Sequence, residues 1–96
     1  MPRHLNLTTC QYMISNVFAR RGINPRVQPV PIDVMTPLAR DVRQELDRVG
    51  AGGDDLDACF DLLVGEVLDK TMTAAGQQMA VDRLAAGFRS KPHLAS

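Results

Sequence analysis

The sequence has no tryptophan, two cysteines, two histidines and only 4% aromatic residues among its 96 positions. With so few aromatic rings, we do not expect the aromatic stacking surfaces on which the bases of single-stranded nucleic acid bind. No apolar run approaches the roughly 18 residues of a membrane span, and no charged-then-apolar leader is recognisable, so neither a span nor a signal peptide is expected. A net charge of zero also excludes a chain-wide basic surface for nucleic acid or anionic membranes.

Convincing catalytic groups are also scarce. The two histidines, His4 and His93, fall in the terminal segments, far from any nucleophile in sequence. Cys10 and Cys59 have no cationic neighbour that would lower the pKa of a thiol. They lie among apolar residues without a CxxC pair, which predicts two reduced, packed thiols in a cytoplasmic protein; one disulfide in an exported domain is the alternative. We therefore expect no enzyme and no cofactor.

Two short motifs resemble ligand-binding sites but have simpler structural explanations. Residues 50–53, Gly-Ala-Gly-Gly, precede a helix without the lysine of a phosphate-binding loop, so they predict a turn. The acids Asp54, Asp55, Asp57 and Asp61 could share a hard cation, but acids in a first helical turn also match the positive end of the helix dipole. No metal site is expected.

The zero net charge is unevenly distributed along the chain. Residues 1–32 hold four arginines and no acid, residues 33–70 hold ten acids against four bases, and residues 71–96 hold three bases against one acid. Such blocks either attract one another within the fold or mark separate partner surfaces.

Helical patterns dominate the chain. Thr8 and Gln11 match a capping box, and Gly22 follows Arg20 and Arg21 as a stop signal, which predicts a helix over about 9–21. Further helices are expected from Thr36-Pro37 to the 50–53 turn, from the acids at 54–57 to about residue 70, and from Thr71 or Thr73 to about 89. The boundary between the last two helices has no glycine or proline to define it.

Residues 23–36 contain Pro25, Pro29 and Pro31 and predict an extended segment rather than a helix. Val30, Ile32 and Val34 alternate and would share one face of an edge strand or of an arm laid over the core.

The order of extended segment, helix, glycine turn and helix over 28–70 resembles that of the ribbon-helix-helix repressors. The matching residues are Val30, Ile32 and Val34 for the strand, Leu38, Val42 and Leu46 for the first helix, and Phe60, Leu63 and Val67 for the second. The resemblance implies a dimeric DNA-binding regulator. The positions that would meet DNA depart from the family, because they are Pro29, Pro31 and Asp33 on the strand and three aspartates at the second helix.

The sequence therefore predicts one mainly α domain over 1–96. We expect a dimeric bundle of three or four helices, with a Pro-rich extended segment between the first two and mobile tails at 1–7 and 90–96. The last helix combines a stripe of Val81, Leu84 and Phe88 with a second face of small residues and methionine that suits a partner helix. The members of this second face are Met72, Ala75, Gly76, Met79, Ala86 and Gly87. The expected function is a non-catalytic interaction module, an adaptor, inhibitor or accessory factor acting through apolar helix faces, with DNA binding as the alternative.

Two sets of candidate site residues follow. The expected partner-binding residues are Leu62, Met72, Ala75, Gly76, Met79 and Arg83. The expected anion-binding residues, which could touch phosphate if nucleic acid is the partner, are Arg20, Arg21 and Arg26.

Overall fold

The structure is a computed structural model that describes residues 7–50, 54–69, 71 and 73–89. It contains four helices in this part of the chain: α1 (Leu7–Arg20), α2 (Ile32–Arg48), α3 (Asp54–Leu68) and α4 (Ala74–Arg89). No strand occurs among these residues. The mainly helical prediction is confirmed, and the predicted tails lie outside the described residues except for Leu7, which belongs to α1.

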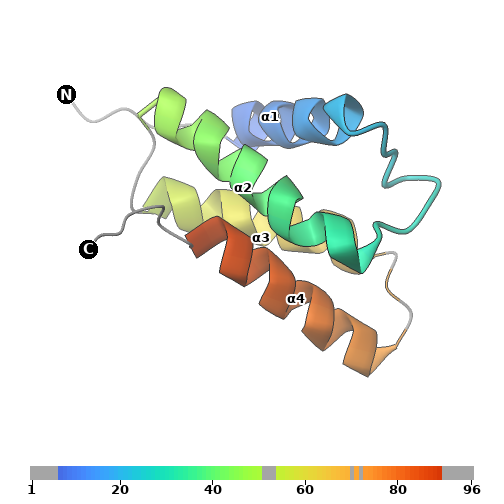
Figure 1. The fold of residues 1–96 in the computed structure, drawn as a ribbon. Helices are drawn as coiled ribbons and strands as arrows, with labels where there is room; N and C mark the ends of the chain where they lie inside the picture. The colour runs from blue at the N-terminus through green and yellow to red at the C-terminus, as the bar shows by residue number, and fades with distance from the viewer. Residues whose placement is uncertain (1–6, 51–53, 70, 72, 90–96) are drawn as a thin grey trace.

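The helices pack around one apolar core (Figure 1). α2 and α4 make the most extensive contact and run in the same direction, whereas α1 and α3 run the opposite way. Each helix contributes to the core, which is completed by Val30 from the loop before α2. No helix of the described part is long and apolar enough to cross a membrane.

Glycine ends α1 as the sequence predicts. Gly22 has a φ of 69°, and its N–H donates to the Ala19 carbonyl at 3.0 Å while the Ile23 N–H donates to that of Phe18 at 3.0 Å. This pair of bonds is a Schellman motif, which needs a residue with positive φ after the helix. α1 begins two residues earlier than predicted, so the expected cap Thr8 lies inside its first turn.

The predicted start of the second helix was wrong. α2 begins at Ile32 with Pro31 as its N-cap, so Ile32 and Val34 are helical and Pro37 lies inside the helix. The earlier start of α2 buries Met35, which is 1% exposed. Met35 extends the apolar stripe of Leu38, Val42 and Leu46 by one turn. That burial outweighs the backbone hydrogen bond lost at Pro37.

Because α2 begins at Ile32, the described residues lack the strand that a ribbon-helix-helix arrangement requires. Of the three residues assigned to that strand, only Val30 lies outside α2, in a loop where it is buried against the core. The predicted extended segment is thus reduced to the loop between α1 and α2, over 21–31, which begins with turns.

The prediction of two reduced thiols was also wrong. Cys10 of α1 and Cys59 of α3 form a disulfide with Cα atoms 5.7 Å apart. Both residues face the core, where α1 packs against α3, and a Cα separation in this range suits a disulfide. Sequence spacing alone could not show that these two helices are neighbours.

α3 and α4 are separate helices. Thr73 caps α4, because its hydroxyl oxygen accepts the Gly76 N–H at 3.0 Å. Its buried residues include Gly87, where an added Cβ would collide with the Thr36 carbonyl oxygen and lie 3.0 Å from the Ala39 Cβ. The sequence placed Gly87 on a partner-facing stripe, but this glycine instead allows α4 to approach α2.

Candidate functional site

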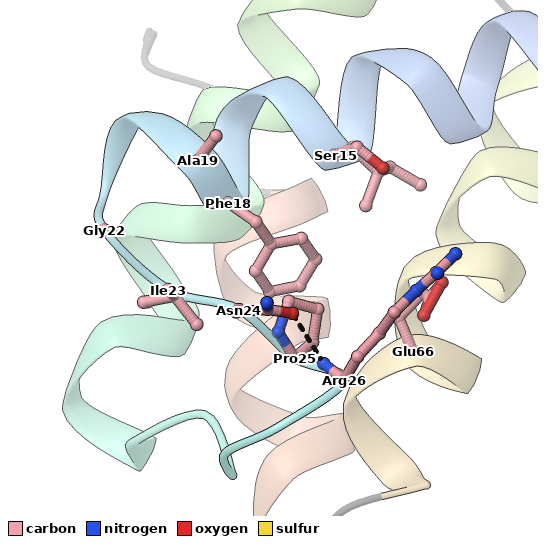
Figure 2. A pocket seen from close by; sticks show the side chains of 10 residues that line it. Ser15, Phe18, Ala19, Gly22, Ile23, Asn24, Pro25, Arg26 and Glu66 are labelled. Atoms are coloured by element: carbon pink, nitrogen blue, oxygen red, sulfur yellow. Dashed lines mark hydrogen bonds between the residues drawn. The ribbon is translucent and has the colours of Figure 1, made fainter.

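Two surfaces of the described fold are candidates for binding, and the first is a cleft between the second half of α1, the 21–31 loop and α3 (Figure 2). Its volume is about 410 Å³. Ile14 and Phe18, which are buried, form its floor together with Ile23 and Pro25. The lining is completed by Ser15, Ala19, Gly22, Asn24, Arg26 and Glu66.

Asn24 organises the loop that forms one wall of the cleft. Its side-chain oxygen accepts the Arg26 N–H at 3.1 Å, and its carbonyl oxygen accepts the N–H groups of Val27 and Gln28, both at 3.1 Å. Such side-chain and backbone bonds are typical of asparagine turns. They fix the backbone from which the Arg26 side chain extends toward Glu66 of α3.

Among the described residues, neither Arg26 nor Glu66 forms an ion pair. The cleft therefore combines an apolar floor with one cation and one anion that are available to a ligand. This combination of apolar surface and a few polar groups is typical of binding sites for small molecules.

The three predicted anion-binding arginines occupy different environments. Arg20 contacts Glu45 with an N–O distance of 3.2 Å, and Arg21 contacts Asp41 with one of 2.6 Å, so both connect α1 to α2. The hydrogen bond from Arg20, aided by the charge of nearby Arg48, holds the pKa of Glu45 below its ordinary value. Arg26 alone of the three lines the cleft.

The second candidate surface is the outward side of α4, which we call the α4 outer face. Its members are Ala75, Met79, Asp82, Arg83 and Ala86, all exposed and spaced so that they share one side of the helix. Met79 is 49% exposed, which is high for a large apolar side chain. Three predicted partner-binding residues, Ala75, Met79 and Arg83, therefore lie together here.

The other predicted partner-binding residues lie elsewhere. Leu62 is half-buried on α3, where it packs against the core and lines a shallow depression next to Glu66. Gly76 is half-buried, and a Cβ added there would lie 3.1 Å from the side chains of Thr71 and Thr73. Met72 lies outside the described residues.

No group of three or more histidine, cysteine or acidic residues in the described part of the chain is arranged to hold a metal ion. The acids at the start of α3 occupy its first turn, where they complement the helix dipole. Both cysteines are joined in the disulfide, so neither provides a free thiol.

Sequence reasoning missed the cleft. The stop at Gly22 and the Asn24-Pro25 pair indicated a turn, but nothing in the sequence placed Glu66, about forty residues later, across from Arg26. The proximity of Glu66 to Arg26 depends on the packing of α1 against α3.

Comparisons with known proteins give no relative for this chain. No family model matches it, and neither a curated protein nor a solved structure matches it significantly.

Proposed function

We propose that this protein is a non-catalytic protein-interaction module that self-associates through the α4 outer face. The observation that carries the proposal is the half-exposed side chain of Met79 between the exposed residues Ala75 and Ala86. A second helix can approach closely over small residues, and a methionine side chain adapts to the surface it meets.

The charges on this face favour a second copy as its occupant. Asp82 and Arg83 are adjacent and exposed, and Arg83 has no side-chain ion pair with a described residue. In an antiparallel pairing with its twofold axis between these two positions, Asp82 faces the partner's Arg83 and Met79 lies over the partner's Ala86. One surface patch is then complementary to itself, as a twofold dimer requires.

The module is proposed as non-catalytic because the chain offers few groups for catalysis. The disulfide removes both thiols as nucleophiles, and the shifted pKa of Glu45 arises from a surface ion pair with Arg20 outside the cleft. We do not propose a cytoplasmic location. That expectation depended on reduced thiols, whereas Cys10 and Cys59 form a disulfide, and disulfides are typical of oxidising compartments.

Light scattering at micromolar concentration tests the proposal. We expect a dimer for the unchanged protein and a monomer for Met79→Glu, because the substitution puts a charge in the centre of the contact. Gln44→Glu adds the same charge at an exposed position of α2 and should leave the dimer intact.

A pull-down from lysate, with mass spectrometry and with nuclease present or absent, extends the test to other partners. A monomer would contradict self-association, and a monomer that also captures no protein would contradict the interaction module as a whole. Capture that is lost with nuclease would favour nucleic acid instead.

A further inference from the structure

We propose that the cleft between α1, the 21–31 loop and α3 binds a free α-amino acid with an apolar side chain. The proposal is independent of the α4 outer face, which contributes no residue to the cleft. It rests on the floor of the cleft, its two charged groups and the order of its loop.

The floor suits an apolar side chain of moderate size. Ile14 and Phe18 are each 2% exposed, so the core fixes their packing and they present little surface to a ligand. The half-buried Ile23 and Pro25 supply the accessible apolar surface on the loop side. The volume of about 410 Å³ is at the lower end of the range for small-molecule sites. The cleft therefore suits a ligand of amino-acid size.

The two charged groups suit the head of such a ligand. Arg26 and Glu66 extend toward the same part of the cleft from different elements (Figure 2). An α-amino acid carries its carboxylate and its ammonium on neighbouring atoms, so the carboxylate can pair with Arg26 while the ammonium pairs with Glu66. A ligand with only a carboxylate would be repelled by Glu66, and a ligand with only an ammonium would be repelled by Arg26.

The loop is ordered before a ligand arrives. The Schellman motif at Gly22 and the hydrogen bonds of Asn24 fix the backbone on both sides of Pro25. Binding then costs little loop ordering, and the principal remaining cost is immobilising the side chains of Arg26 and Glu66.

Nuclear magnetic resonance titration with L-leucine and L-phenylalanine tests the proposal. We expect saturable shifts of the backbone amides of Ser15, Gly22 and Asn24, with a Kd of about 1 mM or tighter. N-acetyl-leucine lacks the ammonium and leucine amide lacks the carboxylate, so each should bind about tenfold more weakly or worse. Glycine, which has no side chain for the floor, should be similarly weak.

Two variants assign the binding to the proposed groups. Arg26→Gln and Glu66→Gln should each weaken leucine binding by about tenfold or more. The matched controls Arg40→Gln and Asp57→Asn remove exposed charges of α2 and α3 that do not line the cleft, and they should bind leucine normally.

Three results would overturn the proposal. They are the absence of localised shifts at about 10 mM leucine, equal binding of leucine and its N-acetyl derivative, and unchanged binding in both charge variants. Fold integrity is checked in the same spectra, since core amides away from the cleft must keep their positions.

Discussion

The two pairs of helices that run in the same direction, α2 with α4 and α1 with α3, are held together by different means. α4 approaches α2 closely at Gly87, and the contact is extended by two side-chain bonds to its backbone: Thr36 donates to the Arg83 carbonyl at 3.3 Å and Arg43 to that of Phe88 at 2.7 Å. α1 and α3 are joined covalently by Cys10–Cys59, and a cleft opens beside their contact. The contact between α2 and α4 is thus extensive and closely packed, whereas the covalently linked pair α1 and α3 has a smaller contact.

The largest effect is expected from removing the disulfide. The double substitution Cys10→Ser and Cys59→Ser should lower the free energy of unfolding by about 2–4 kcal/mol, because the closed loop restricts the unfolded chain. Denaturant unfolding of the oxidised protein and the variant measures the difference. Equal stabilities would show that the link contributes nothing to the contact of α1 with α3.

The next effect concerns the close approach of α4 to α2. Gly87→Ala should destabilise the fold by about 1–3 kcal/mol, because the added Cβ meets the Thr36 carbonyl oxygen, which belongs to the backbone and cannot move away easily. Thermal unfolding is the measurement.

Gly65→Ala is the matched control for that substitution. A Cβ at Gly65 has nothing within 4 Å, and alanine favours a helix more than glycine does, so stability should rise by about 0.5–1 kcal/mol. Two alanines with the same sign of effect would contradict the described packing.

A smaller effect is expected at the end of α4. The Arg43 guanidinium donates to the carbonyl oxygen of Phe88 in the last turn, where a cation also suits the helix dipole. Arg43→Gln should therefore destabilise the protein by about 1–2 kcal/mol, measured by denaturant unfolding. Arg40→Gln, at an exposed position of the same helix, should have little effect.

The smallest effect is the pH dependence contributed by Glu45, which connects α1 to α2. Arg20 holds the pKa of Glu45 below its ordinary value of 4.5, so the stabilisation is present above that pH and is lost as the pH falls through the lower, folded-state value. Glu45→Gln should remove this acid-range loss, seen as a shallower fall of stability below about pH 4.5. An unchanged slope would mean that the ion pair is not formed in solution.

Local sequence signals predicted most of the fold but not its contacts. Gly22 and the acids at 54–57 marked helix ends that the structure confirms, because caps and stops act within a few residues. Of the two threonines predicted as starts of the last helix, the structure selects Thr73. Pro37 misled the prediction, since burial of Met35 one turn earlier outweighs the cost of a proline inside α2.

The candidate sites were predicted less well, because they depend on which helices are neighbours. The outward position of Met79 followed from helical spacing, whereas the disulfide and the meeting of Arg26 with Glu66 required the packing of α1 on α3. Arg20 and Arg21, which the sequence predicts as anion-binding residues, form ion pairs with Glu45 and Asp41 of α2.

Hydrogen exchange measured by mass spectrometry, with and without a reductant, tests most directly the claim that the two helix pairs are held by different means. Reduction of Cys10–Cys59 should speed amide exchange in α1 and α3 far more than in α2 and α4, because the latter pair keeps its close packing and its backbone hydrogen bonds. Equal acceleration in all four helices, or none in any of them, would contradict that account.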